Sequence, residues 1–374
     1  MHRVAISSTG LFTPPEVITN EELVAAFNAY ATIENEKYAD EIAAGTHTPI
    51  TNSSVEFIEK ASGIKRRYVM NKSGVLDPRR MHPKFATRPD TELSLMAEIA
   101  VKAGQDALAA AGKTAADVDG VICAAANMQR AYPAMGVEIQ TALGIKGWAF
   151  DMNVACSSAT FGLEMAVNAV RTGSARAILV VNPEITSCHL AWQDRDCHFI
   201  FGDVCTAILV ERLDLAPAGA FEILGTKLLT SFSNAIRNNA GFMSRAEDRN
   251  PDDRDLLFRQ EGRKVFKEVC PMAAEHISGH LAAHDLQPTQ VRRFWLHQAN
   301  LSMNQLIARK LLGRDATTEE APVILDEFAN TASAGSIIAF HRHKADFQSG
   351  EVGVICSFGA GYSIGSAIVQ KLAA

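Results

Sequence analysis

The strongest constraint on the fold is an internal repeat of helix, linker and apolar strand. Residues 93–127 run through an amphipathic helical pattern, a polar linker and an apolar stretch, and they end at Asn127. Residues 261–300 follow the same order, and their apolar stretch ends at His297. A repeat of this length indicates duplicated structural units. Strands that alternate with helices predict parallel-rich sheets covered by helices, which is an α/β fold.

A second pair of segments continues the repeat. Cys156 starts a helical pattern followed by an apolar strand, and Ser333 starts the same series of elements near the end of the chain. In this alignment Ser333 occupies the position of Cys156. We therefore expect two duplicated βαβαβ-type halves. The boundary between them falls near Pro217, so that residues 1–216 form the first half and residues 217–374 the second.

Two local departures interrupt this plan. Residues 31–53 are polar and irregular, and we expect an inserted surface segment there, either solvated or covering the mouth of a site. Pro271 lies inside the helical pattern of the second half, where a proline should kink or split the helix.

Composition excludes several classes of protein. The chain has 374 residues with 47% hydrophobic content, enough for a large core. Its net charge of −6 gives no general attraction to nucleic acid or membranes. No apolar run is long enough to span a bilayer, and residues 1–7 read as a strand rather than a signal peptide. Seven scattered cysteines favour a reducing, cytoplasmic location.

Metal binding is not expected from the cysteine and histidine pattern. The pairs Cys188-His189 and Cys197-His198 could be imagined as zinc ligands, but their spacing matches no tight metal motif.

Three polar residues in different segments are candidates for catalysis. Cys156 lies at a predicted strand-to-helix turn among small residues, where the helix dipole would lower the thiol pKa and favour a nucleophilic thiolate. Read alone, Cys156 is more typical of a small buried residue, and the segments of His297 and Asn330 reverse that judgement. His297 follows an apolar strand and Asn330 lies in a turn of small residues, so a fold could bring the three together.

Four motifs in order resemble the ketosynthase III family, the β-ketoacyl-ACP synthases III within the thiolase-fold superfamily. They are Val-Ala-Cys156-Ser-Ser, His297-Gln-Ala-Asn, Asn330-Thr-Ala-Ser-Ala and the glycine-rich segment 357–365. The resemblance implies a thiolase-like fold with five layers, α-β-α-β-α. It also implies a homodimer that joins an acyl-CoA primer to malonyl-ACP by decarboxylating Claisen condensation in fatty-acid synthesis. CoA and ACP thioesters are then substrates, and no cofactor is expected.

The family's catalytic roles fall on matching positions of this chain. Cys156 would carry the acyl group, and His297 and Asn330 would donate hydrogen bonds to the malonyl thioester oxygen as negative charge grows there. The resemblance also implies an oxyanion hole made by the backbone N–H groups of Cys156 and Gly361. Tyr132 would cross the dimer interface to line the partner's acyl pocket, with an ordinary buried tyrosine as the alternative.

Binding of CoA or the carrier is less clearly marked. Lys267 and Arg263 share a helix whose counterpart docks the acidic carrier, and Lys65 begins a basic run through Arg67 that suits an acidic partner or a solvated strand edge equally well. Three positions depart from the family. Ser302 replaces a docking arginine, and Phe57 and Ala61 stand where a Trp and an Arg clamp the CoA adenine.

Two further functions stay open at this point. An enzyme of the same fold could transfer the acyl group from Cys156 to an amine or alcohol without decarboxylation, although Asn330 favours condensation. A non-catalytic acyl-carrier or acyl-CoA binding protein would not need the Cys156, His297 and Asn330 set.

Overall fold

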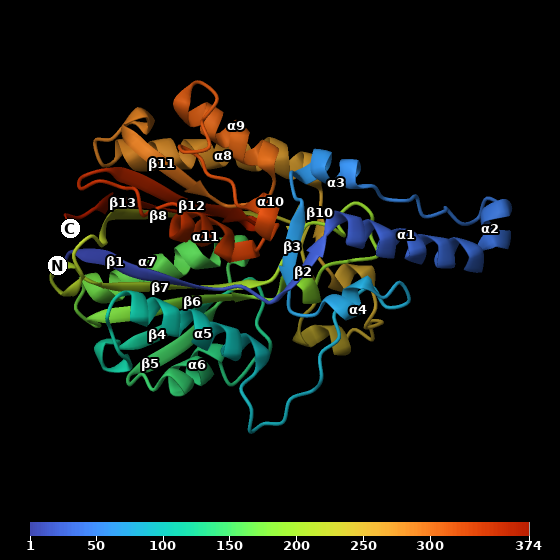
Figure 1. Ribbon diagram of the computed structural model, residues 1–374, viewed down its shortest axis with the longest axis horizontal. Coiled ribbons are helices and arrows are strands. Elements are labelled where there is room, and N and C mark those ends of the chain that lie inside the picture. Colours follow the sequence, from blue (N-terminus) through green and yellow to red (C-terminus); the bar gives the residue numbers. More distant parts are fainter. Residues whose placement is uncertain (374) are drawn as a thin grey trace.

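The computed structural model describes residues 1–373 and contains one large mixed sheet of nine strands (Figure 1). The strand order is β11-β12-β13-β8-β1-β7-β6-β4-β5. The strands, in chain order, are β1 (Val4–Phe12), β4 (Gly120–Ala124), β5 (Trp148–Met152), β6 (Ala177–Glu184), β7 (Val204–Arg212), β8 (Phe221–Ser233), β11 (Val291–Leu296), β12 (Val352–Gly359) and β13 (Gly361–Lys371).

The sheet consists of two parts joined by a short pairing between β1 and β8. Only two residue pairs make this join, Ala5 with Glu222 and Ile6 with Phe221. The strands of the first part come from the N-terminal half, and β4 runs parallel to both β5 and β6. Those of the second part come from the C-terminal half, where β11 and β12 are parallel. The predicted boundary near Pro217 lies just before β8.

Helices cover both sides of each part of the sheet. The outer layers are α5 (Leu95–Ala110) with α6 (Met135–Leu143), and α8 (Gly262–Ala282) with α9 (Leu301–Leu312). Helices α7 (Ser158–Arg171) and α11 (Gly335–Arg342) lie between the two parts. Alternate residues of a strand face different layers: Val121 packs with α5, whereas Ile122 packs in the central cluster with α7. The predicted five-layered, thiolase-like arrangement is confirmed.

The repeat is also visible in the backbone at the start of the central helices. Ala155 and Ala332 adopt left-handed φ angles of +46° and +48°, which are unfavourable for residues with a side chain. They directly precede Cys156 and Ser333, the two positions that the sequence repeat aligns. Helix α8 runs through Pro271 as one helix, so of the predicted kink or split the split is wrong and the kink stays a prediction.

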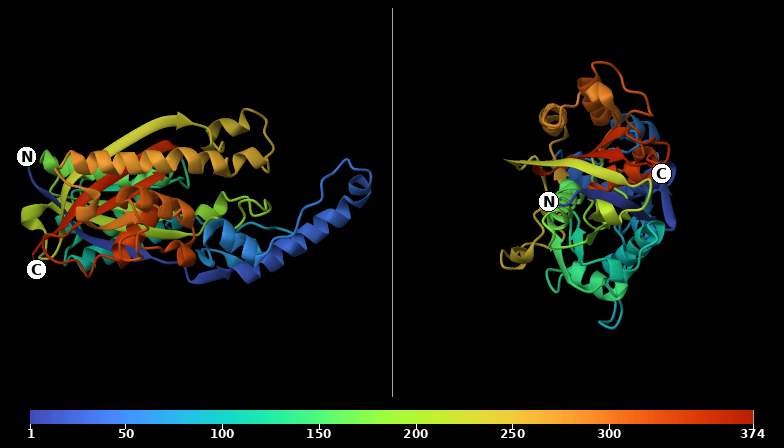
Figure 2. Two further views of the ribbon diagram at one scale, coloured as in Figure 1. Left: turned by 90° about the horizontal axis from the view of Figure 1, so that it is seen from above. Right: turned by 90° about the vertical axis from the view of Figure 1, so that its left-hand side faces the viewer.

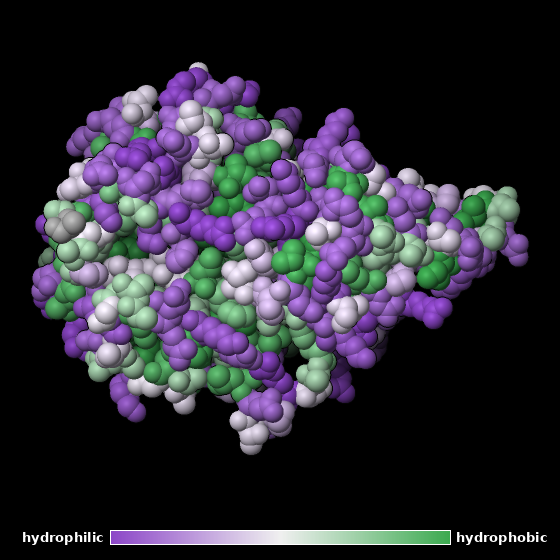
Figure 3. Space-filling view, viewed as in Figure 1, coloured by the Kyte–Doolittle hydropathy of each residue, from purple (hydrophilic) through white to green (hydrophobic). Residues whose placement is uncertain are grey.

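Residues 31–53 form a projection that is helical in its first part and irregular only after it. Helix α1 (Asn20–Lys37) continues to residue 37 and is followed by α2 (Ala39–Ala43), whereas residues 47–53 return without regular structure. The two helices extend away from the body of the molecule (Figures 1 and 2). Apolar and polar residues alternate along the projection (Figure 3). The sequence reading was wrong here because good helix formers such as Glu34 and Glu36 were taken only as polar.

Two asparagines of α1 hold the returning chain of the projection. Asn28 accepts a hydrogen bond from the Ser53 N–H at 2.8 Å and donates one to its carbonyl at 3.2 Å. Asn35 makes the same pair of bonds with Ile50, at 2.8 and 3.0 Å. The two asparagine side chains therefore satisfy backbone N–H and carbonyl groups of the returning segment, which is not paired in a sheet.

Short elements next to the projection form a cap against the rest of the molecule. A separate apolar cluster that includes Phe27, Trp192 and Phe201 joins them. The elements are β2 (Glu16–Thr19), β3 (Arg66–Val69), α3 (Val55–Ser62), α4 (Lys72–Leu76), α10 (Leu325–Phe328), β9 (Ile236–Arg237) and β10 (Arg259–Gln260).

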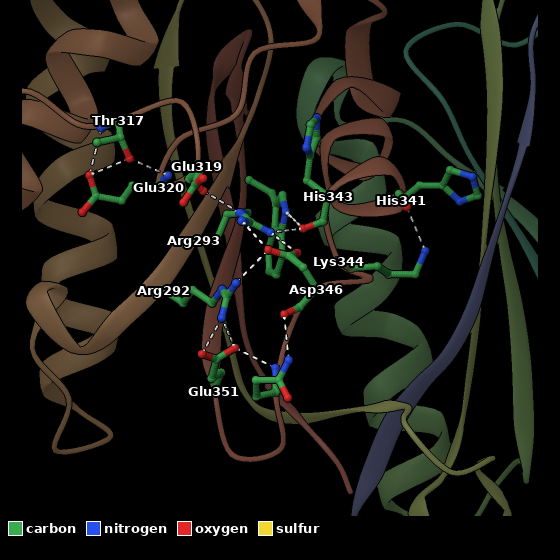
Figure 4. Close-up of polar contacts among 12 residues, drawn as sticks. Arg292, Arg293, Thr317, Glu319, Glu320, His341, His343, Lys344, Asp346 and Glu351 are labelled. Carbon is green, nitrogen blue, oxygen red and sulfur yellow. Dashed lines mark hydrogen bonds and ion pairs between the residues drawn. The ribbon is translucent and has the colours of Figure 1, made fainter. Parts of the chain in front are cut away.

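A charged network anchors β11, the strand that leads to His297 (Figure 4). Arg293 is buried, and its guanidinium donates to Asp346 at 2.7 and 3.0 Å and to the His343 carbonyl at 2.6 Å. Arg292 bonds to the same Asp346 at 2.7 Å and to Glu351. The network fastens β11 to the connection between α11 and β12.

None of the helices described in residues 1–373 combines the length and the apolar character needed to cross a lipid bilayer.

Candidate active site

Cys156, His297 and Asn330 line one cavity of about 250 Å³. They come from the start of α7, the end of β11 and the turn after α10, so the fold joins segments of both halves. Other walls of the cavity are mainly apolar and come from the cap, from α8 and from the end of β12; they include Phe199, Phe258, Val265 and Phe358. The convergence that the sequence predicted for these three residues is present in the structure.

The glycine-rich loop makes room for the Cys156 side chain. Cys156 is 9% exposed and lies in a single 3₁₀ turn directly before α7. A β-carbon at Gly359 would come 2.6 Å from the cysteine Cβ and 3.0 Å from its Sγ. Only glycine fits at position 359, because real side chains do not approach so closely.

Burial controls the ionisation of the Cys156 thiol. It raises the pKa of Cys156 to about 12, and the negative charge of Glu184 acts in the same direction. The nearby backbone N–H groups of Ala360 and of Cys156 itself act in the other direction and lower the pKa of the thiol. Burial of the sulfur therefore opposes the lowering of the thiol pKa that was expected at the helix terminus, and the thiolate stays a prediction.

His297 is a neutral imidazole in this environment. The residue is 1% exposed, and burial lowers its pKa to about 4. Its backbone N–H bonds to the Cys356 carbonyl at 2.8 Å, and its ring packs edge-on against Phe358. Within residues 1–373 its buried Nδ1 has no hydrogen-bond partner, which leaves Nε2 for the cavity. A neutral ring can donate one hydrogen bond there.

The Asn330 amide is oriented by its own turn. Its Oδ1 accepts a hydrogen bond from the Ala332 N–H at 2.9 Å, which leaves the Nδ2 group to face the cavity. Its backbone bonds to the Ile200 carbonyl at 2.9 Å and to the Gly202 N–H at 3.1 Å. The Asn330 amide N–H groups are therefore available as donors at the wall of the cavity, and the catalytic role of Asn330 stays a prediction.

Two other residues of the His297-Gln-Ala-Asn motif hold the surrounding backbone in place. Gln298 is fully buried, donates to the Leu296 carbonyl at 2.9 Å and accepts from the Ile324 N–H at 3.0 Å. Asn300 caps α9 and donates to the Ala61 carbonyl at 2.6 Å. The predicted oxyanion donor Gly361 is exposed at the start of β13, and its role stays a prediction.

Basic residues lie near the mouth of the cavity. Arg263 and Lys267 are exposed on the first turns of α8, whose Val265 and Phe266 line the cavity. Lys65 is exposed just after α3. Arg67 fits neither predicted alternative, contact with an acidic partner or a solvated strand edge. It is fully buried and donates hydrogen bonds to the Asn20 side chain and to the carbonyls of Ile18 and Phe199.

No group of three or more potential metal ligands comes together within residues 1–373. The two Cys-His pairs have separate surroundings. The Asn127 side chain lies 2.8 Å from the His189 ring, and His198 packs against Phe27 with ring centroids 4.5 Å apart.

Comparisons with known proteins show the family to which the chain belongs. Two family models described as 3-oxoacyl-[acyl-carrier-protein] synthase III match residues 150–230 and, for the C-terminal model, residues 281–371. A β-ketodecanoyl-[acyl-carrier-protein] synthase of Pseudomonas aeruginosa is 60% identical over 347 residues, which are 92% of this chain and 99% of that protein. The chain belongs to the β-ketoacyl-ACP synthase III family. The predicted enzyme class, a transferase of fatty-acid synthesis, is thereby confirmed.

More distant members of the β-ketoacyl-ACP synthase III family extend the match to nearly the whole chain. A family member from Granulibacter bethesdensis is 28% identical over 373 residues, 99% of this chain and 100% of that protein. The crystal structure of a 3-oxoacyl-[acyl-carrier-protein] synthase III from Aquifex aeolicus superposes with a TM-score of 0.76. It covers 98% of this chain and 99% of its own at 24% identity, and so supports the fold alone.

An aromatic and an arginine meet at the mouth of this β-ketoacyl-ACP synthase III. The guanidinium of Arg195 lies 3.8 Å from the ring centroid of Phe57. Phe57 was named from the sequence, but Ala61 was taken as the missing arginine position. Arg195 was missed because it lies far along the chain; its side chain also donates to the Asn52 carbonyl at 2.8 Å.

Tyr132 does not line the cavity of its own chain. The residue is 85% exposed, so the alternative of an ordinary buried tyrosine is wrong. Next to it lies a larger hollow of about 1530 Å³, lined by Pro133, Val137, Asn127 and His189 among others. The role of Tyr132 in a partner's pocket stays a prediction.

Proposed function

We propose that this protein condenses an acyl-CoA primer with malonyl-ACP through an acyl-Cys156 intermediate. The observation that carries the proposal is the common cavity of Cys156, His297 and Asn330, in which a thiol faces a neutral imidazole and an oriented carboxamide. A thioester bound there would meet one nucleophile and two hydrogen-bond donors.

The first half-reaction transfers the acyl group to sulfur. The Cys156 sulfur attacks the thioester carbonyl, the carbon–sulfur bond to CoA breaks, and the thiol proton leaves with the CoA sulfur. The tetrahedral oxyanion would be held by the N–H groups of Cys156 and Ala360, in place of the Gly361 group named from the motif. Ala360 is favoured because it follows Gly359, whose backbone lies against the Cys156 side chain, and because its N–H lowers the pKa of the thiol.

The second half-reaction forms the carbon–carbon bond. Malonyl-ACP loses carbon dioxide, and the resulting enolate oxygen accepts hydrogen bonds from His297 and Asn330. The enolate carbon attacks the acyl-Cys156 carbonyl, and the cysteine sulfur leaves and takes up a proton. The products are a β-ketoacyl-ACP, carbon dioxide and the free Cys156 thiol.

The chain length follows from the name of the relative that is 60% identical. A β-ketodecanoyl product has ten carbons, and malonyl-ACP contributes two of them after decarboxylation. The primer is therefore octanoyl-CoA, if the two proteins share their product. The apolar walls of the cavity suit a medium-length acyl chain.

The mouth and the surface support the expected partners. Phe57 and Arg195 offer a flat, cationic surface on which the CoA adenine can stack. Arg263, Lys267 and Lys65 would contact the acidic carrier. The edge strand β5 exposes stacked Trp148 and Phe150, which favours a homodimer formed along that edge, with Tyr132 reaching the partner. A cytoplasmic location fits substrates of this kind.

Acyl transfer to an amine or alcohol is the second candidate. It needs only Cys156 and a base, whereas the oriented Asn330 amide has a use only when an enolate forms. No group among the described residues favours this alternative specifically.

The proposal is tested by offering acyl-CoA primers of two to twelve carbons together with malonyl-ACP. The expected result is carbon dioxide release coupled to a β-ketoacyl-ACP, with the highest kcat/KM for the eight-carbon primer. Acyl-CoA consumption without carbon dioxide would support transfer instead, and no turnover of any primer would contradict both.

A further inference from the structure

Glu184 is a buried carboxyl group that neither half-reaction uses. It ends β6 and is 1% exposed. Its hydrogen-bond partners are the Ala126 N–H, at 3.0 and 3.3 Å from the two carboxyl oxygens, the Ser333 N–H at 3.2 Å and the Ser333 hydroxyl. No basic side chain is among these partners, which is unusual for a buried carboxyl group.

These bonds connect the two halves of the chain behind the active site. Ala126 belongs to the segment after β4, where the Asn153 side chain also holds it by a hydrogen bond of 2.9 Å to its carbonyl. Ser333 lies three residues after Asn330, in the turn that orients the Asn330 amide. Glu184 therefore fixes this turn relative to the half that carries Cys156.

Glu184 also acts on the Cys156 thiol through its charge, since its carboxylate raises the pKa of Cys156. Burial raises the pKa of Glu184 itself to about 8, so the group changes charge near neutral pH. Three other titratable groups interact with it: Asp203 ahead of β7, Cys123 on β4 and Cys205 on β7. All are acids, so no cation offsets the Glu184 charge.

We propose that Glu184 is a positioning residue for the condensation, which ties the Asn330 turn to the half that carries Cys156. The charge of the same carboxylate also acts on the Cys156 thiol. This inference rests on the proposed function, in which the Asn330 amide must be held in place to donate a hydrogen bond to the enolate during malonyl decarboxylation. A resting site that keeps its sulfur protonated is also less easily oxidised or alkylated between turnovers.

The test uses Glu184→Gln, which keeps the shape and an acceptor oxygen but removes the charge. The rate of Cys156 alkylation by iodoacetamide is followed against pH by peptide mass, which requires no substrate. Removal of a neighbouring negative charge should lower the pH midpoint by about one unit. The matched control is Glu211→Gln, since Glu211 is also 1% exposed but lies at the opposite end of β7 and pairs with Lys113.

A second variant, Ser333→Ala, removes the hydroxyl bond and keeps the charge. It should leave the alkylation midpoint unchanged and slow malonyl decarboxylation about tenfold relative to acylation. An unchanged midpoint in Glu184→Gln, the same shift in Glu211→Gln, or equal loss of both half-reactions in Ser333→Ala would overturn the proposal. If wild type is never acylated by any primer, the proposed function fails, while the alkylation midpoints still decide the charge effect of Glu184.

Discussion

The backbone of Gly359 lies directly against the Cys156 side chain, and a single methyl group at position 359 would overlap the cysteine Cβ at 2.6 Å. Gly359 ends β12 and Cys156 precedes α7, so this contact joins the second half of the chain to the first. The position of the sulfur therefore depends on the packing between the halves.

Gly359→Ala should displace Cys156 and reduce its acylation by about 100-fold, the loss typical of a misplacement near 1 Å. Stopped-flow or quenched measurement of octanoyl transfer checks this. Gly241→Ala is the matched control, because a methyl group there meets nothing within 4 Å and its backbone is extended. Wild-type acylation in Gly359→Ala would mean that the loop yields without moving the sulfur.

Asn330→Asp should slow malonyl decarboxylation by at least two decades and spare acylation of Cys156. The aspartate keeps the oxygen that accepts from the Ala332 N–H, so the turn is retained, while the amide donor is replaced by an oxygen that repels the enolate. The two half-reactions are measured separately, as carbon dioxide release and as protein mass. Equal loss in both would indicate damage to the fold instead.

Arg195→Ala should raise KM for octanoyl-CoA about tenfold and leave kcat nearly unchanged. The loss corresponds to about 1.4 kcal/mol of binding energy, the upper range of an exposed cation–π contact plus a hydrogen bond. An octanoyl-pantetheine primer, which lacks the adenine, serves as the internal control. A matching rise in KM for this shortened primer would place Arg195 away from the adenine.

Asp346→Asn should destabilise the fold by about 1–3 kcal/mol at neutral pH, because buried Arg293 loses its charged partner while Asp346 itself is half exposed. Hydrogen bonds with Arg293 lower the pKa of Asp346 below its unfolded value near 3.9. The difference in thermal midpoint from wild type should thus be constant from pH 7 to about 5 and shrink below about pH 4.

Asp315→Asn provides the comparison for this pH series. Asp315 pairs with Arg309, but both side chains are more than half exposed, so its loss should change the midpoint little. A similar fall in the thermal midpoint of both variants would show that the ion pairs of Asp346 stabilise the fold no more than an exposed ion pair does.

The sequence predicted the catalytic set because each member lies in a local motif whose place in the fold is set by the repeat. Cys156 and His297 follow strands that end near the same cavity, and the turn of Asn330 is marked by its small residues. The Arg195–Phe57 contact could not be predicted in this way, because it joins two segments that only the cap brings together.

Errors in the sequence reading have physical causes too. The projection was taken as irregular because polarity was weighed above helix propensity, and the asparagine bonds that hold its return are tertiary contacts. The thiol pKa was expected to fall because the helix terminus was considered without burial, which dominates at Cys156.

The central claim is that Cys156 carries the acyl group during turnover. The most direct measurement is the intact mass of the protein after incubation with octanoyl-CoA, with peptide mapping, followed by addition of malonyl-ACP. We expect an octanoyl adduct on Cys156 that disappears when malonyl-ACP is added and never forms in Cys156→Ser. An adduct on another residue, or one that malonyl-ACP does not discharge, would contradict the account.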